Sequence, residues 1–322
     1  MKLKKFVAVL LAGVITTTAF IGCGAKTEEE VTEKEGKKLK VGVALLYKGD
    51  EWLAAISDEY ERQAAELGYE INVQDGNQDN EKQTQQIENF ITQQYDVIIA
   101  SAADAQGIIP AIQKAEEAGI PVVSTDTPIE YSYVSTCVAW DNYETGVKLG
   151  EYAKKYIEEN YADKEKVNLV MINAPSYPHL VKRDEGFLSI INTIDKVEII
   201  ATQDANGSRE VSANIINNNI AKGIDMVYGV VDNHAWGAVT ALEEAGAEEC
   251  AVLSCGGYGD EPFTALSENH KYYKALIVVP PVDVVRDSLA AAVKAVNGEE
   301  LEDITNTSFG LADSSNVKDY MD

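Results

Sequence analysis

Polar and aromatic side chains recur directly after short apolar segments of this chain, where they could hold a small polar ligand. Carboxylates such as Asp50 and Asp126 accept hydrogen bonds from hydroxyl groups, and an indole such as Trp52 can stack on an apolar ligand face. The residues that we predict to contact a ligand are Asp50, Trp52, Ser101, Asp126, Thr127, Trp140, Tyr177, His179, Asn206, Asp232 and Tyr258. Together they indicate capture of a small polar solute by hydrogen bonding and stacking.

Motifs of common enzymes and metal sites are absent from the sequence. It has no Gly-x-Ser-x-Gly elbow, no phosphate-binding Gly-x-x-x-x-Gly-Lys loop and no His-Glu-x-x-His pair. His179 and His234 fall on candidate site loops, but no third metal ligand has a suitable spacing. We therefore predict a protein that is not an enzyme and uses no cofactor or metal. Both histidines are expected to bond the solute or to lie on surface loops.

Several candidates have a structural interpretation that the sequence leaves open. Trp52 heads an apolar helical stripe and could belong to the core, and Trp140 is equally open. Asp126 could form an Asx turn, and Asp232 could cap the helix that follows it. For Trp236 the helical spacing of its apolar neighbours favours a place in the core.

The chain contains two copies of one pattern, offset by about 129 residues. The matching segments are 74–77 (QDGN) with 203–206 (QDAN), 96–98 (DVI) with 225–227 (DMV), and 116–119 (EEAG) with 243–246 (EEAG). This period is far longer than that of a solenoid repeat. It therefore indicates two copies of one domain.

Each copy alternates apolar, strand-like segments with helical patterns. In the first copy the strands are expected at 39–46, 70–74, 97–100 and 121–124, and the helices at 52–67, 80–94 and 107–118. The second copy repeats this order from 167 to 254. Such alternation predicts an α/β protein with parallel sheets. Ligands of these sheets bind beyond the carboxyl ends of the strands, where the candidate residues fall.

The N-terminus carries the marks of export. Three lysines precede an apolar stretch that is too short for a permanent membrane span. The sequence Ile21-Gly22-Cys23 that follows resembles a bacterial lipobox, which implies cleavage before Cys23 and a diacylglycerol on its sulfur. An ordinary signal peptide is the alternative. Residues 23–38 are strongly charged and lack periodicity, so we predict a flexible tether between the lipid anchor and the folded part.

Charge and cysteine content narrow the choice of partners. The formal net charge is −26, which argues against nucleic acid because phosphate binding needs clustered Lys and Arg. Cys137, Cys250 and Cys255 have no zinc-site spacing, and two of them would lie about 17 Å apart at the ends of one strand. We therefore expect free, mostly buried thiols. We also expect a monomer.

The whole pattern resembles the periplasmic sugar-binding proteins of the ribose and galactose type, which share a fold with LacI-like effector domains. The resemblance covers residues 39 to about 310. It is carried by the segments Val41-Gly42-Val43, Gly119-Ile120-Pro121-Val122-Val123, Asp141-Asn142, Arg183-Asp184-Glu185-Gly186-Phe187 and Gly237-Ala238. It implies two Rossmann-like lobes that close on a carbohydrate-like ligand and deliver it to the permease of an ABC importer. A receptor for a chemoreceptor or sensor kinase remains the alternative.

The resemblance also implies a division of the chain. An N-terminal lobe would comprise 39–140 plus 280–305, and a C-terminal lobe 141–279 plus 306–322, after a signal peptide at 1–22. Three hinge crossings would lie near residues 140–141, 279–280 and 305.

Among single positions, the resemblance implies that Trp52 stacks on the sugar and that Asp50 and Asp126 bond its hydroxyls. The ligand arginine falls on Val181 or Arg183. Three further positions that carry polar side chains in the family are Val231, Gly256 and Val279 here. The usual sugar hydrogen-bond set is therefore incomplete, and we expect a sugar-like ligand other than plain ribose or galactose.

Overall fold

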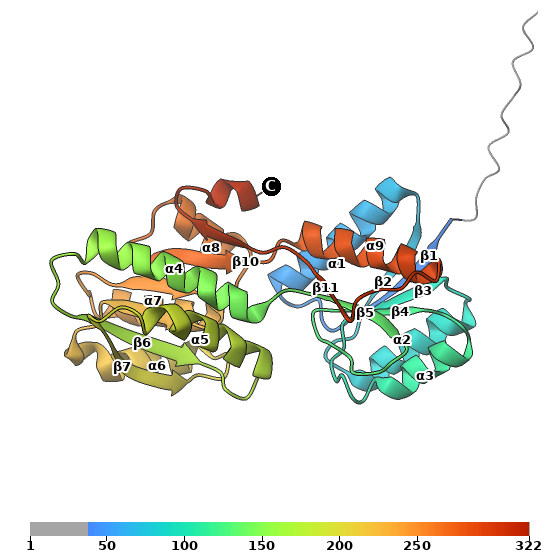
Figure 1. The fold of residues 1–322 in the computed structure, drawn as a ribbon, viewed down its shortest axis with the longest axis horizontal. Helices are drawn as coiled ribbons and strands as arrows, with labels where there is room; N and C mark the ends of the chain where they lie inside the picture. Colours follow the sequence, from blue (N-terminus) through green and yellow to red (C-terminus); the bar gives the residue numbers. More distant parts are fainter. Residues whose placement is uncertain (1–37, 322) are drawn as a thin grey trace, which may run out of the picture. The chain divides into compact units, whose positions relative to one another are not determined.

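The computed structural model describes residues 38–321. The predicted signal peptide, the lipidated Cys23 and the predicted tether up to residue 37 lie outside the described residues. Within 38–321 the chain forms two six-stranded sheets, each covered by helices on both faces (Figure 1). We call the first sheet with its helices the N-lobe and the second the C-lobe.

The N-lobe sheet has the strand order β11-β5-β4-β3-β1-β2, with every neighbouring pair parallel. Its strands are β1 (Lys40–Leu45), β2 (Glu70–Asp75), β3 (Val97–Ala100), β4 (Val122–Thr125), β5 (Val134–Ala139) and β11 (Ile304–Asn306). Its helices are α1 (Glu51–Leu67), α2 (Asn80–Thr92), α3 (Ile109–Glu117) and α9 (Pro281–Val296). In Figure 1, α1 and α9 lie on one face of this sheet and α2 and α3 on the other.

The C-lobe sheet has the order β12-β10-β9-β8-β6-β7. Its strands are β6 (Val167–Asn173), β7 (Val197–Asp204), β8 (Met226–Gly229), β9 (Ala251–Ser254), β10 (Tyr273–Val278) and β12 (Gly310–Asp313). Its helices are α4 (Asn142–Asn160), α5 (Pro178–Ile191), α6 (Arg209–Asn219), α7 (Asp232–Glu244) and α8 (Asp260–Ser267), with short 3₁₀ turns η1 (Ile220–Lys222) and η2 (Val317–Tyr320). Only the β10–β12 pair is antiparallel in this sheet.

The duplication inferred from the sequence is confirmed by the strand order. The first four strands of the N-lobe are arranged β4-β3-β1-β2, and those of the C-lobe are arranged β9-β8-β6-β7. Each sheet separates two hydrophobic clusters, one on each face, and Trp236 lies in a C-lobe cluster as predicted. Cys137, Cys250 and Cys255 are free and buried, also as predicted.

The chain passes between the two sheets three times within the described residues. It does so after β5, after β10 and between β11 and β12. The third passage uses residues 307–309, because Thr305 is still paired with Val138 inside the N-lobe sheet. The lobe boundaries themselves stay predictions.

Local sequence explains where the site helices begin. The Asp50 carboxylate accepts a hydrogen bond from the Leu53 N–H at 2.8 Å and so caps α1. At the other end, Gly68 adopts a left-handed φ of 71°, which glycine tolerates without a Cβ clash, and closes the helix. Asp141 caps α4 in the same way as Asp50. These caps fix the loops at the carboxyl ends of the strands.

Candidate functional site

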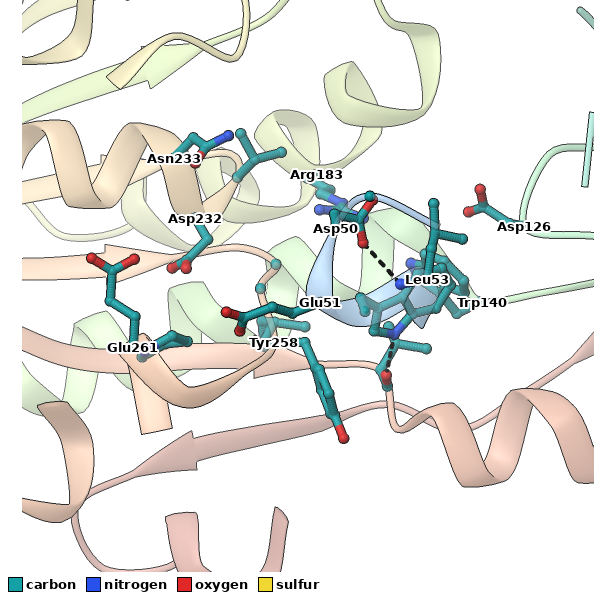
Figure 2. A pocket seen from close by; sticks show the side chains of 18 of the residues that line it. Asp50, Glu51, Leu53, Asp126, Trp140, Arg183, Asp232, Asn233, Tyr258 and Glu261 are labelled. Atoms are coloured by element: carbon teal, nitrogen blue, oxygen red, sulfur yellow. Dashed lines mark hydrogen bonds between the residues drawn. The ribbon is translucent and has the colours of Figure 1, made fainter. Parts of the chain in front are cut away.

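Two cavities lie at the carboxyl ends of the strands, and each is lined by residues of both lobes. The first has a volume of about 620 Å³ and the second about 960 Å³. They share the lining residues Leu46, Asp126, Trp140, Arg183 and Val231. The first cavity holds Asp50, Trp52, Asp126 and Arg183 together with Val231, Gly256 and Val279 (Figure 2). These are the single positions that the family resemblance assigned to ligand contact, and all of them except Val181 line this cavity.

The loop after β1 contributes two carboxylates to the first cavity. Asp50 uses one oxygen as the cap of α1, and its other oxygen has no hydrogen-bond partner among residues 38–321. Glu51 begins α1, and its carboxylate accepts the Asp260 N–H at the start of α8 in the C-lobe, at 3.1 Å. Glu51 was not among the residues predicted from the sequence, although it directly follows the predicted Asp50.

Asp126 lines both cavities from the end of β4. Its backbone has a left-handed φ of 65°, an uncommon conformation for a residue with a Cβ, of the kind that clusters at functional sites. Burial raises the pKa of its carboxyl to about 6, while Arg183 acts in the opposite direction and Asp50 adds to the rise. Its side-chain hydrogen bond is to Thr127, and it has no ion-pair partner within 4 Å in the described chain. The carboxylate thus keeps acceptor capacity for a ligand.

Arg183 is 8% exposed and is held by neutral groups of the C-lobe. Its Nε donates to Asn142 Oδ1 at 2.8 Å, and its Nη1 donates to the carbonyls of Cys255 at 2.8 Å and Val230 at 3.4 Å. A Cβ on Gly256 would lie 2.3 Å from Nη1, so the guanidinium occupies the place of a side chain at 256. Arg183 lines both cavities and Val181 lines neither.

Asp232 lies in the first cavity wall but is engaged inside the C-lobe. Its two oxygens accept hydrogen bonds from Trp236 Nε1, at 3.0 Å, and from the Tyr273 hydroxyl. Burial raises the pKa of its carboxyl to about 6, against the effect of these donors. The expectation that Asp232 caps α7 is wrong, because Val231 occupies the cap position and Asp232 is the first helical residue.

The two tryptophans of the site lie next to a chain crossing. Trp52 Nε1 donates to the Val279 carbonyl at 2.8 Å, which ties α1 to the segment between β10 and α9. Its ring meets that of Trp140 edge to face, with centroids 5.6 Å apart. Both rings also line the first cavity. Their contact with a ligand stays a prediction.

The remaining predicted residues divide between the cavities. Thr127, Tyr177, His179 and Asn206 line the second cavity, whereas Tyr258 lines the first. Burial lowers the pKa of His179, and the nearby Arg183 charge adds to this. The imidazole is therefore expected to be neutral and able to donate or accept a hydrogen bond.

Two residues lie away from both cavities. Ser101 is 1% exposed at the end of β3 and lines neither cavity. His234 is fully buried, with Nε2 accepting the Gly207 N–H at 2.8 Å and Nδ1 facing the Ile172 carbonyl. Both sequence-based interpretations of His234 are therefore wrong, since it fastens two C-lobe loops together.

An ion pair that sequence reasoning missed lies at the edge of the first cavity. Arg209 bonds both oxygens of Glu261, at 3.0 and 2.6 Å, and also reaches Asn233 Oδ1 at 3.0 Å. The partners are 52 residues apart, so spacing offers no signal for them.

In the described part of the chain no group of three or more His, Cys, Asp or Glu side chains could hold a metal ion. No helix within 38–321 is long and apolar enough to cross a membrane.

The family model of the periplasmic binding protein domain matches residues 41–300. The chain belongs to this family. Its two-lobed fold is that of the type I periplasmic binding proteins, as the sequence resemblance implied.

Curated relatives and solved structures are similar to this chain over most of its length. The ribose import binding protein of Bacillus subtilis is 25% identical over 269 residues, which are 83% of this chain and 84% of the relative. The galactofuranose-binding protein of Escherichia coli is 27% identical over 217 residues, which are 65% of this chain and 67% of the relative. A solute-binding protein of Actinobacillus succinogenes with bound D-allose superposes with a TM-score of 0.75 at 24% identity, covering 88% of this chain and all of that one.

Proposed function

We propose that this protein captures a carbohydrate in its first cavity and delivers it to an ABC importer. The observation that carries the proposal is the meeting of Asp50, Trp52, Asp126 and Arg183 in one cavity between the lobes. The family match and the printed functions of the relatives support it, because they include import proteins for ribose and D-apiose. These names also favour import over the sensory alternative.

The geometry suits hydroxyl groups. Asp50 and Asp126 offer carboxylate oxygens that accept hydrogen bonds from hydroxyl donors, and such charge-assisted bonds are stronger than neutral ones. Arg183 uses Nε and Nη1 within the C-lobe, which leaves Nη2 to donate to a ligand oxygen. A ligand that bonds both lobes stabilises the closed arrangement, since only differential affinity shifts such an equilibrium.

The proposed setting is the outer surface of the cell membrane. Cys23 is proposed to carry the lipid, with the permease as protein partner and the protein itself as a monomer. Cys23→Ala is expected to abolish diacylglycerol labelling and to release the protein or leave it unprocessed. Unchanged labelling of that variant would refute the anchor without affecting the proposed ligand.

A thermal-shift screen tests the proposed capture. Pentoses, hexoses, sugar alcohols, nucleosides and amino acids are each added to the full mature chain. A true ligand at 100-fold excess over its dissociation constant stabilises by about 2.7 kcal/mol, which moves the melting midpoint visibly. Stabilisation by amino acids alone, with none by any sugar or sugar alcohol, contradicts the carbohydrate proposal.

A further inference from the structure

One part of the C-lobe wall of the first cavity carries no polar side chain. Val231, Gly256, Gly257 and Ile277 line this part at the ends of β8, β9 and β10. Val279 adjoins them at the chain crossing, where it also packs in a hydrophobic cluster of the N-lobe. A ligand hydroxyl turned toward these residues would lose its water without gaining a side-chain partner. Leaving a buried polar group unpaired costs on the order of 1–3 kcal/mol, which is about 5- to 150-fold in affinity.

The backbone carbonyls around this wall are also engaged. Arg183 Nη1 donates hydrogen bonds to the carbonyls of Val230 and Cys255. It occupies the space that a side chain at Gly256 would fill. The Val279 carbonyl accepts the Trp52 indole N–H at 2.8 Å. This bond uses the only hydrogen-bonding group of the Trp52 side chain, so the indole presents an apolar surface.

The charged side chains of the C-lobe are partnered within the protein. Both oxygens of Asp232 are bonded to Trp236 and Tyr273. Arg209 and Glu261 form a two-pronged ion pair. Among the described residues on this side, the side-chain groups with free donors are Arg183 Nη2, the Asn233 amide and the Tyr258 hydroxyl.

The opposite wall has the reverse character. Asp126 and Asp50 each keep an unpaired carboxylate oxygen at the N-lobe side of the same cavity. Figure 2 shows these two carboxylates apart from Asp232 and Glu261 of the C-lobe. One edge of the cavity therefore accepts hydroxyl donors, while the other offers methyl groups and bare backbone.

We propose that the first cavity selects a sugar with one hydroxylated edge and one apolar edge, namely a deoxy or C-methyl sugar. The hydroxylated edge bonds Asp50 and Asp126, and the apolar edge packs on Val231, Val279 and the Gly256 backbone. This inference rests on the proposed carbohydrate capture and adds the class of carbohydrate.

Titration calorimetry with sugars that differ by one hydroxyl tests the proposal. The pairs are D-galactose with D-fucose, L-mannose with L-rhamnose, and D-ribose with 2-deoxy-D-ribose. The deoxy member of every pair that binds is expected to bind about tenfold or more tightly than its fully hydroxylated counterpart. If the hydroxylated member binds equally or more tightly, this inference is overturned while carbohydrate capture stands. If neither member of any pair binds, the proposed class of ligand is overturned.

A single substitution is expected to reduce the preference for the deoxy sugar. Val279→Gln adds an amide to the apolar wall and should reduce the deoxy preference at least tenfold, because the extra hydroxyl gains a partner. Val282→Gln is the matched control, since its side chain is 44% exposed on α9 and outside both cavities. Val231→Asn provides a second test that does not threaten folding, because Val231 stands at the uncapped N-terminus of α7. An unchanged preference in both cavity variants overturns the assignment of this wall.

Discussion

The two lobes share one strand order but use their carboxylates differently. In the N-lobe, Asp126 follows β4 in a left-handed conformation and leaves its carboxylate open to the cavity. In the C-lobe, Asp232 follows β8 and gives both oxygens to Trp236 and Tyr273. Burial raises the pKa of both groups to about 6, so burial alone does not separate them. The two carboxylates follow strands that do not correspond in the duplication, since β4 matches β9 and β8 matches β3. The difference teaches that the local partners of a carboxylate at a strand end decide whether it stays open to the cavity or holds the fold.

The largest effect is expected for Asp126→Asn. Replacing the free carboxylate by an amide removes a charge-assisted acceptor, so affinity for the ligand should fall about 30- to 150-fold, which corresponds to about 2–3 kcal/mol. Stability should stay the same or rise, because asparagine tolerates the left-handed conformation and carries no buried charge. Calorimetry and thermal melts measure both quantities. Asp58→Asn, on the exposed face of α1, is the control. Equal affinity in the two variants would remove Asp126 from the site.

Asp232→Ala should give the opposite result. The substitution leaves the buried Trp236 N–H and Tyr273 hydroxyl without their acceptor, so the free energy of unfolding should drop by about 2–3 kcal/mol. Ligand affinity in the remaining folded protein should change less than threefold. Denaturant titration and calorimetry at low temperature test this pair of outcomes. A large loss of affinity with full stability would show that the C-lobe carboxylate also binds ligand.

The pH dependence of stability tests burial in both lobes together. Burial raises the pKa of Asp126, Asp184 and Asp232 to about 6, above the ordinary value of 3.8. Protonation therefore favours the folded state, and this stability is lost as the pH rises through about 6. Lowering the pH from 7.5 to 5.5 should add about 1–2 kcal/mol to the free energy of unfolding. Urea melts at both pH values measure it, and a decrease on acidification would contradict the burial of these groups.

Trp52→Phe gives the smallest expected effect and separates packing from hydrogen bonding. Phenylalanine keeps an aromatic ring beside Trp140 but loses the bond to the Val279 carbonyl. Stability should fall by about 1 kcal/mol, and ligand affinity should change little if the ring contributes only its face. Thermal melts and calorimetry distinguish the two. A tenfold loss of affinity would mean that the indole N–H turns to the ligand on binding.

Local patterns were sufficient to predict the architecture. The 129-residue offset and the alternation of apolar strands with helices predicted two like sheets, because strand burial and helix periodicity are recorded in neighbouring residues. The positions of Asp50 and Asp126 followed from the rule that ligands gather at the carboxyl ends of parallel strands. Arg183 was implied only by the family resemblance, which left Val181 as the alternative.

Partnerships across long sequence distances could not be predicted. Tyr273 lies 41 residues from Asp232, and Cys255 lies 72 residues from Arg183, so neither contact leaves a spacing signal. His234 shows the same limit, since only the fold shows that its ring lies between Ile172 and Gly207. Which polar group remains free for a ligand is therefore a tertiary property.

The third passage between the sheets has a consequence for the order of folding. β11 completes the edge of the N-lobe sheet beside β5, and β12 completes the edge of the C-lobe sheet beside β10, within ten residues of each other near the C-terminus. During synthesis, both edges therefore remain open until residues 304–313 have emerged from the ribosome. Neither sheet of a chain built in this way can be completed before these late strands have been made.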